Sequence, residues 1–129
     1  MILKFRFYSE RMNKIGIVIS LHPLRNRVYV EWDDTLSGTE DIDDNGVLMQ
    51  STGLFDVNDK EIFEGDIVKI IYDGKPFIGV VVYDLGEADF KATNNHEDYG
   101  NNFQYLTVGE SIEIIGDIYE NKELVEVEK

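Results

Sequence analysis

The feature that most constrains the fold is a pair of β-branched runs on either side of Asp73-Gly74. The runs are IVKIIY at residues 67–72 and KPFIGVVVY at residues 75–83. Asp-Gly supplies the positive backbone φ angles that a two-residue type I′ turn requires, so the segment predicts a β-hairpin. In that hairpin we expect Ile70 to face Phe77 from the opposite strand.

Four further segments alternate apolar and polar residues or gather β-branched ones, as strands do. They lie at residues 2–8, 15–19, 28–32 and 111–119. A helical period of 3.6 is nowhere sustained over about ten residues. Several short strands around a long hairpin predict a mainly β protein, in which an N-terminal antiparallel β part precedes a C-terminal small barrel.

A polar stretch predicts the boundary between these parts. Residues 33–46, DDTLSGTEDIDDNG, lose the apolar alternation and gather acidic residues, Gly, Ser and Thr. Such a composition is typical of an exposed loop or a domain boundary. We therefore expect an N-terminal β part over residues 1–47, and a C-terminal region over residues 48–129 that contains the barrel and a short tail. Residues 93–102 are polar and rich in Asn, which indicates a loop in the second region.

The composition excludes several classes of site. The chain of 129 residues has no Cys, so it has neither disulfides nor thiolate zinc sites. Charged residues interrupt the N-terminal segment at every second position, unlike the continuous apolar stretch of a signal peptide. No apolar run approaches the roughly 20 residues that span a bilayer. We expect a cytoplasmic protein that does not engage a membrane.

The formal net charge of −14 is divided unevenly along the chain. Residues 1–30 hold six basic residues and one acidic residue, whereas residues 31–129 hold six basic and 25 acidic residues. One interpretation is that the basic N-terminal part docks on the acidic body, within one subunit or between subunits, because opposite charges attract over roughly 8–10 Å in physiological salt. The other is an acidic surface that repels nucleic acid, or imitates it to occupy a basic protein.

Residues 41–46, DIDDNG, match the first six positions of a calcium-binding EF-hand loop. Asp41, Asp43 and Asn45 would supply oxygen ligands at positions one, three and five. Thr52, however, stands at the twelfth position, where a bidentate Glu should complete the coordination sphere. An acidic, solvated loop is the alternative interpretation, and we expect no metal site apart from this weak calcium candidate.

The sequence contains no recognisable catalytic constellation. His22 and His96 are its two histidines and lack the HxxxH or HExxH spacing of metal sites, and there is no GxSxG, P-loop or GxGxxG motif. Carboxylates are so numerous that a hydrolytic pair of acids cannot be identified from spacing. We expect no catalytic residues and no cofactor.

Basic and aromatic residues are interleaved near the N-terminus, a pattern that can bind single-stranded nucleic acid through phosphate contacts and base stacking. The aromatic residues also alternate as the core of a strand would, and the rest of the chain repels phosphate. We therefore expect these side chains to form core and subunit contacts rather than to bind nucleic acid. The residues concerned are Lys4, Phe5, Arg6, Phe7, Tyr8, Arg11, Lys14, Arg25, Arg27, Tyr29 and Trp32.

Three segments together carry a family resemblance. The central segment includes LMQSTGL at residues 48–54 and KEIFEGDIV at residues 60–68, and a later segment reads IIGDIYEN at residues 114–121. With Lys4-Phe5-Arg6 near the start, this pattern resembles the YopX family of phage and prophage proteins. The sequence departs from that family, in which an aromatic residue, Gly and Pro are usual, at Ser51, Asp59 and Lys122.

The resemblance implies a β-rich protein that self-associates, and it implies that the small barrel of the second region is SH3-like. The family has no assigned reaction, so it provides no catalytic or cofactor-binding residues. Gly53 and Gly65-Asp66 lie where the predicted strands need turns, and we interpret the matched residues as structural.

The sequence therefore predicts an uncharacterised phage or prophage protein that acts in the bacterial cytoplasm as a non-enzymatic assembly or protein-binding module. Its expected partners are a second copy of itself and a basic host or phage protein. Two alternatives remain open at this point. One is an acidic nucleic-acid mimic that blocks a host DNA-binding protein, and the other is a small hydrolase with an unrecognised carboxylate site.

Overall fold

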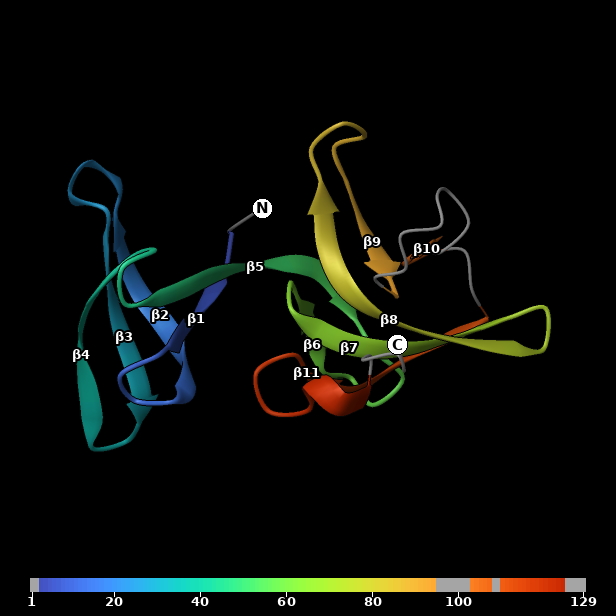
Figure 1. Cartoon of the computed structure of the whole chain (residues 1–129), viewed down its shortest axis with the longest axis horizontal. Coiled ribbons are helices and arrows are strands. Elements are labelled where there is room, and N and C mark those ends of the chain that lie inside the picture. Colours follow the sequence, from blue (N-terminus) through green and yellow to red (C-terminus); the bar gives the residue numbers. More distant parts are fainter. Residues whose placement is uncertain (1–2, 95–102, 108–109, 125–129) are drawn as a thin grey trace. The chain divides into compact units, whose positions relative to one another are not determined.

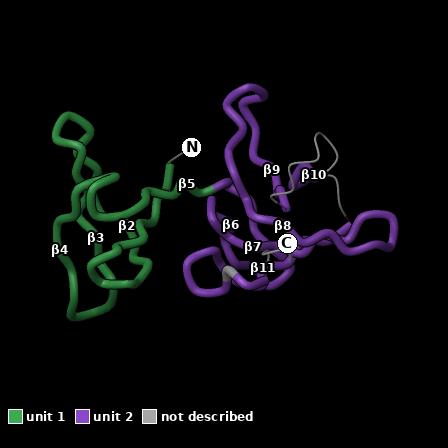
Figure 2. Tube along the Cα trace, in the orientation of Figure 1, with its two compact units in different colours: residues 1–51 green, residues 52–129 purple. Residues whose placement is uncertain are grey.

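The computed structural model describes residues 3–94, 103–107 and 110–124. It contains eleven β-strands and two short 3-10 helices, and no α-helix occurs within those residues (Figure 1). The strands form two antiparallel sheets, of six and five strands, which confirms the predicted mainly β class. The chain divides into two compact units, residues 1–51 and 52–129 (Figure 2). The boundary predicted between residues 47 and 48 lies four residues before this division, within the strand β5 (Gly46–Phe55), which continues into the second unit.

The six-stranded sheet has the strand order β4-β3-β2-β1-β5-β6. Its first four strands follow one another as a meander, and β1 then pairs with β5 on its other side. β5 begins in the first unit and ends in the second, where β6 adjoins it. The elements are β1 (Phe5–Ser9), β2 (Lys14–His22), the 3-10 helix η1 (Pro23–Arg25), β3 (Arg27–Asp33), β4 (Leu36–Asp41), β5 (Gly46–Phe55) and β6 (Glu61–Phe63).

One face of the β1–β5 sheet forms the core of the first unit. Phe7 on β1 and Val28 and Val30 on β3 are completely buried. They alternate with outward-facing residues because successive side chains of a strand point to opposite faces. Burial of each such side chain contributes roughly 1.5–3 kcal/mol to folding. The partly buried residues packed against them are Val18, Trp32, Ile42 and Leu48.

The five-stranded sheet has the order β10-β9-β8-β7-β11 and lies in the second unit. The strands β7 to β10 follow one another along the chain, and the last strand returns to pair with β7. The elements are β7 (Asp66–Tyr72), β8 (Lys75–Asp84), β9 (Asp89–Thr93), β10 (Phe103–Tyr105), β11 (Ser111–Asp117) and the 3-10 helix η2 (Lys122–Leu124).

The hairpin predicted around Asp73-Gly74 is confirmed. β7 pairs with β8 in the expected register, with Ile70 opposite Phe77. Asp73 has a φ of 52° and Gly74 a φ of 77°, the two positive values that a type I′ turn needs. The local sequence thus determined both the turn and the register of these strands.

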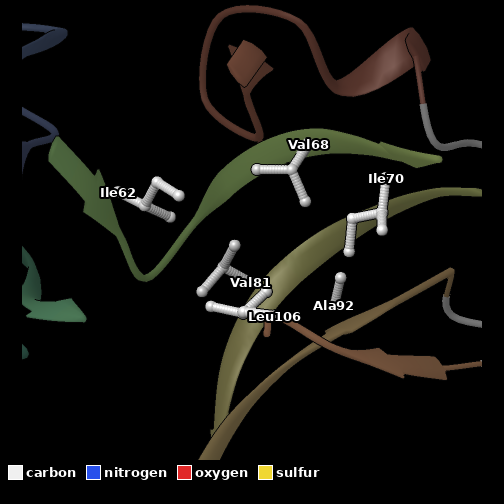
Figure 3. Packing of buried hydrophobic residues seen from close by; sticks show 6 residues of the cluster. All are labelled: Ile62, Val68, Ile70, Val81, Ala92 and Leu106. Carbon is white, nitrogen blue, oxygen red and sulfur yellow. The ribbon is translucent and has the colours of Figure 1, made fainter. Parts of the chain in front are cut away.

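The core of the second unit gathers apolar side chains from β5 to β9, from β11 and from Leu106, which directly follows β10. Figure 3 shows the six buried members of this cluster. Each strand contributes through the alternation of its residues, as Val68 and Ile70 do on β7. The buried cluster consists of Ile62, Val68, Ile70, Val81, Ala92 and Leu106, and the partly buried residues around it are Leu54, Phe77, Phe90, Ile112 and Ile114.

The small barrel predicted for the second unit is not closed within residues 3–94, 103–107 and 110–124. β10 and β11 are the two outer strands of an open sheet. β10 has three residues, so it forms only three residue pairs with β9 at the edge of the sheet. The β6 strand, which could extend such a sheet, adjoins β5 in the other sheet instead.

Candidate functional site

The outer face of β2 and β3, opposite the buried core, carries exposed apolar side chains. Val18 pairs with Val30 on the core side, so the neighbouring residue Ile17 points outward. A β-bulge follows, because the register shifts between Val18 and Ser20. The extra residue of a bulge disturbs the strict alternation of a strand, and Ile19 is exposed at this point.

Three residues of this face, Ile17, Ile19 and Tyr29, form what we call the outer patch. Ile17 and Ile19 each expose 55% of their surface, and Tyr29 exposes 39%. Tyr29 pairs with Ser20 immediately beyond the bulge, and its hydroxyl lies 2.7 Å from Ser37 Oγ on β4. This hydrogen bond fixes the direction of the Tyr29 ring across β3 and β4.

The charges around the outer patch are balanced. Arg27 Nε donates to Asp41 Oδ1 at 2.8 Å across β3 and β4. Arg6 and Glu31 are the cross-strand neighbours of Ile17 on its two sides. Arg6 and Glu31 thus flank Ile17 in the sheet, and the Arg27–Asp41 ion pair joins the neighbouring strands β3 and β4.

Basic residues of the N-terminal segment are paired within the first unit. Arg11 Nη2 lies 2.9 Å from Glu40 Oε2, and Lys14 Nζ lies 3.8 Å from Asp33 Oδ2. With the Arg27 pair, three of the six basic residues at positions 1–30 contact acidic residues of β3 and β4. The aromatic Phe7 is buried in the core and is not available for base stacking.

Glu40 is the most deeply buried acidic side chain of the described residues, with 1% exposure. Its Oε2 atom accepts a hydrogen bond from Ser9 Oγ at 2.7 Å in addition to that from Arg11. Ser9 Oγ in turn accepts from the Met12 backbone N–H at 3.1 Å. This buried network was not identified from the sequence, because Ser9 and Glu40 are 31 positions apart.

The residues of the calcium candidate build the turn between β4 and β5. Asn45 Oδ1 accepts a hydrogen bond from the Asp41 backbone N–H at 2.7 Å, and Asp41 Oδ1 is held by Arg27. Asp43 occupies the left-handed region with a φ of 74°. The Asp41 and Asn45 side-chain oxygen atoms that would bind calcium thus accept hydrogen bonds from protein donors. Among the described side chains, no group of three or more His, Cys, Asp or Glu residues could hold a metal ion. His22 Nε2 lies 3.1 Å from Ser20 Oγ, and His96 lies outside the described residues.

A second polar cluster surrounds Lys91 on β9. Its ammonium group lies 2.7 Å from Asp84 and 2.9 Å from Glu87, and 4.1 Å from the centre of the Phe103 ring. Tyr105 donates its hydroxyl proton to Glu87 at 2.9 Å. The hydrogen bonds to Asp84 and Glu87 raise the pKa of Lys91 above its ordinary value, although burial opposes this effect. The cluster joins the β8–β9 turn to the outer strand β10. It was not recognisable from the sequence, because β10 was not predicted.

Two buried aspartates, Asp56 and Asp66, accept hydrogen bonds from backbone N–H groups at turns. Asp56 Oδ1 accepts from the backbone N–H groups of Asn58 and Lys60, and its Oδ2 accepts from that of Ile114. Burial alone would raise the pKa of Asp56, but these three donors outweigh it and lower the pKa below the ordinary value. Asp66 caps the Phe63 backbone N–H in a similar way, at 2.8 Å.

The comparisons with known proteins agree with this architecture. The model of the family described as YopX protein matches residues 4–126. Among solved structures, the crystal structure of protein EF1440 from Enterococcus faecalis is similar, with a TM-score of 0.58 and 23% sequence identity over 98% of this chain and 99% of that chain. No curated protein matches. In the described part of the chain, no helix has the length and apolar character needed to cross a membrane. Because the family match covers almost the whole sequence, the chain belongs to the YopX family.

Proposed function

We propose that this YopX-family protein is a non-enzymatic assembly module of a phage or prophage, which works in the bacterial cytoplasm by binding a protein surface through its outer patch. The observation that carries the proposal is the exposure of Ile17, Ile19 and Tyr29 on the paired strands β2 and β3. Contiguous apolar side chains exposed on a folded surface mark interaction sites.

The size of the outer patch suits the centre of an interface. A few apolar or aromatic residues supply most of the binding energy of a protein interface, and neighbouring polar contacts exclude water from them. Ile17 and Ile19 would supply the apolar anchor, and Tyr29 would add an aromatic ring. The balanced charges around them would form the polar rim. Three anchors predict weak, reversible binding rather than an obligate complex.

The hydrogen bonds and ion pairs of the acidic residues support a non-catalytic role. The acidic residues with lowered pKa values in this structure are engaged in turns and ion pairs, as Asp56 is by backbone donors and Asp84 by Lys91. A catalytic acid or base needs a pKa matched to proton transfer near neutral pH, and these shifts move the carboxylates away from that range.

We also propose that the second unit is SH3-like. The strands β7 to β10 form a meander, and β11 returns to pair with β7. This strand order supports an SH3-like arrangement that is open between β10 and β11. Such small β units commonly serve as binding modules, although fold alone does not determine function.

Sedimentation velocity over a concentration series of the full chain would test the proposed function. The wild-type chain is expected to associate reversibly, and Ile17→Lys and Ile19→Lys are expected to remain monomeric because each places a charge in the apolar centre. Leu85→Lys is the matched control, since Leu85 is 87% exposed on the second unit and gains the same charge. A wild-type chain that stays monomeric at every concentration would contradict the proposal.

The acidity of the second unit favours a second candidate function, a nucleic-acid mimic that occupies a basic DNA-binding protein. Residues 52–129 hold 18 acidic and six basic residues, a net charge of −12. A competition experiment with a basic DNA-binding domain and labelled duplex DNA tests it. Release of DNA by the wild-type chain, with no change in Ile17→Lys, would favour mimicry over assembly through the outer patch.

A further inference from the structure

We infer that the free edge of β4 binds an extended, basic segment of a partner protein as an added β-strand. This inference goes beyond the proposed function, because the backbone of a sheet edge makes the contact rather than the outer patch. It gives a role to residues 33–46, the acidic stretch whose composition predicted a loop and which contains β4.

β4 (Leu36–Asp41) is the outermost strand of its sheet and pairs with β3 on one side (Figure 1). The Asp41 N–H donates to Asn45 Oδ1 at 2.7 Å and the Asp41 C=O accepts from Asn45 N–H at 2.9 Å, so both groups point away from β3. Backbone groups alternate in direction along an antiparallel strand, so those of Ser37 and Thr39 also point away from β3. Both residues are exposed, and in the described part of the chain their outward backbone groups have no hydrogen-bond partner.

The exposed centre of β4 lacks the features that usually protect a sheet edge. Natural edge strands are often protected by Lys, Pro or a bulge. Ser37-Gly38-Thr39 contains neither a charged residue nor proline, and it pairs with β3 without a register shift. Asn45 already occupies the edge at Asp41, so the free edge consists of the outward N–H and C=O groups of Ser37 and Thr39. Such an edge can bind an extended peptide through main-chain hydrogen bonds.

Acidic residues beyond both ends of β4 indicate the charge of the added strand. Residues 33–46 contain six acidic residues and no basic residue. Basic residues of the first unit bind three of the acids. Asp34 in the β3–β4 turn and Asp43 and Asp44 in the β4–β5 turn are exposed and form no ion pair within the described residues. A strand of six residues spans about 20 Å, so an extended segment with basic residues near both ends would place them beside these carboxylates.

A second copy of β4 fits this edge poorly. Antiparallel pairing of two β4 strands about Gly38 would bring the Asp33-Asp34 turn of each copy against the Asp43-Asp44 turn of the other. Like charges that lie opposite one another destabilise a strand pair. A partner of opposite charge avoids this repulsion.

Trp32 lies beside the free edge and provides a signal for binding. A Cβ atom at Gly38 would lie 3.7 Å from Trp32 Cζ3, so the glycine leaves part of the indole ring uncovered by its own side chain. A side chain of the added strand opposite Gly38 would approach this ring, because cross-strand neighbours lie on the same face of a sheet. Trp32 is the single tryptophan of the chain, so its fluorescence reports on this edge.

Amide hydrogen exchange of the full chain, followed by NMR with and without the peptide KKTVTVTKK, tests the inference. We expect the peptide to slow exchange of the Ser37 and Thr39 amides at least about tenfold, because hydrogen-bonded amides exchange only when the bond opens. The emission of Trp32 should change in the same titration. Unchanged exchange of both amides at saturating peptide would overturn the inference.

Two control peptides separate charge from strand addition. EETVTVTEE has the opposite charge at both ends, and KKTPPVTKK keeps the charge but lacks backbone donors on both of its edges. Neither peptide is expected to protect the Ser37 and Thr39 amides. Equal protection by KKTPPVTKK would show that the peptide is held without a β-ladder, which contradicts strand addition.

Two variants at Thr39 test the role of the backbone. Thr39→Pro removes an outward N–H but no hydrogen bond to β3, and edge strands tolerate proline at such positions. Thr39→Val keeps the N–H and the branched side chain. We expect Thr39→Pro to lose the protection of Ser37 by KKTVTVTKK, and Thr39→Val to behave as wild type. Protection of the Val28 and Val30 amides without peptide shows whether β3 and β4 remain paired in Thr39→Pro, and if they do not, the comparison with KKTPPVTKK decides.

Neutralising the acids beside β4 tests the charge of the partner. Asp34→Asn/Asp43→Asn/Asp44→Asn should bind KKTVTVTKK about tenfold more weakly, because three exposed ion pairs are lost. Asn suits position 43, where φ is 74°. The control Asp59→Asn/Asp73→Asn/Glu123→Gln removes three exposed charges from the second unit, and we expect a smaller loss because these residues do not belong to the turns that flank β4. Equal losses in the two variants would contradict recognition by the β4 turns.

The remaining outcomes separate this inference from its competitors and from the proposed function. Protection of Ser37 and Thr39 that rises with protein concentration in the absence of peptide would mean that a second copy occupies the edge, which overturns the inference. Ile17→Lys should leave protection by KKTVTVTKK in place, and its loss there would place the peptide on the outer patch instead. A wild-type chain that stays monomeric in sedimentation but is protected by the peptide would contradict the proposed function and support this inference.

Discussion

The Ser9 hydroxyl on β1 donates a 2.7 Å hydrogen bond to the Glu40 carboxylate on β4, although β2 and β3 separate these strands in the sheet order. Side chains of such distant strands meet only if the sheet is strongly curled. The core residues Phe7, Val28 and Val30 lie on the same side of their strands as Ser9 and Glu40. The curled first sheet thus encloses a core with a polar contact at one end, and its opposite face carries the outer patch.

Glu40→Ala is expected to destabilise the chain by about 1.5–3 kcal/mol, because Ser9 and Arg11 lose a charged hydrogen-bond partner in a buried site. Urea unfolding followed by tryptophan fluorescence measures the change, with Trp32 as the probe. Asp41→Ala removes the exposed ion pair with Arg27 and serves as the control, with an expected loss of about 0–1 kcal/mol. Equal losses in the two variants would show that the buried position of Glu40 has no special importance.

Gly16→Ala is expected to destabilise the first unit by about 1–3 kcal/mol, the usual effect of overpacking a close-packed interior. A Cβ atom at this position would lie 2.5 Å from Val30 Cγ1 and 2.9 Å from Trp32 Cδ1. Gly38→Ala is the matched control, because its Cβ would lie 3.7 Å from Trp32 Cζ3, an ordinary contact. Thermal unfolding monitored by circular dichroism compares the two variants, and a melting temperature for Gly16→Ala as high as that for Gly38→Ala would contradict the packing of Trp32 over Gly16.

Lys91→Met is expected to loosen the attachment of β10 to β9, because the Asp84 and Glu87 carboxylates then repel one another without a cation between them. Hydrogen exchange of the backbone amides of Phe103–Tyr105 should become faster, while exchange in β7 should be unchanged. Lys75→Met is the control, since Lys75 is exposed at the β7–β8 turn. Unchanged protection of β10 in Lys91→Met would mean that main-chain pairing alone holds this strand.

Stability is expected to fall in acid because several carboxyl groups have lowered pKa values in the folded chain. Asp56, Asp84 and Glu87 bind fewer protons than they would in the unfolded chain, so they stabilise the fold above their ordinary pKa values. This contribution disappears as the pH falls from about 4 through the lower pKa values of the folded state.

Urea unfolding between pH 7 and pH 2 measures this dependence. In Asp56→Asn the stability at pH 7 should be lower than in wild type, because the amide nitrogen cannot accept the hydrogen bond from Ile114 N–H. The decline of stability below about pH 4 should also be shallower, since one titrating group has been removed. A slope identical to that of wild type would contradict the role of Asp56 in acid unfolding.

The local sequence determined the strands and turns whose cause is itself local. Asp73-Gly74 specified the hairpin of β7 and β8, since only the backbone angles of the turn and the alternation beside it were needed. The segments predicted at residues 2–8, 15–19, 28–32 and 111–119 overlap β1, β2, β3 and β11, although the sequence did not indicate the exact bounds of the first three strands or the sheet order. The matched family segments were likewise recognisable from the residues alone.

Tertiary structure decided every feature that depends on residues far apart in the chain. The Ser9–Glu40 contact spans 31 positions and the Asp56–Ile114 contact spans 58, and neither has a periodic pattern that would indicate it. The outward direction of Ile19 depends on a bulge in pairing with β3, which a β-branched run alone does not specify. The sequence by itself therefore determined a mainly β chain of the YopX family with an acidic C-terminal part, because composition and short-range alternation encode these properties. Which apolar side chains are buried and which form the outer patch was decided only by sheet order and curl, because these depend on contacts between strands that are distant in sequence.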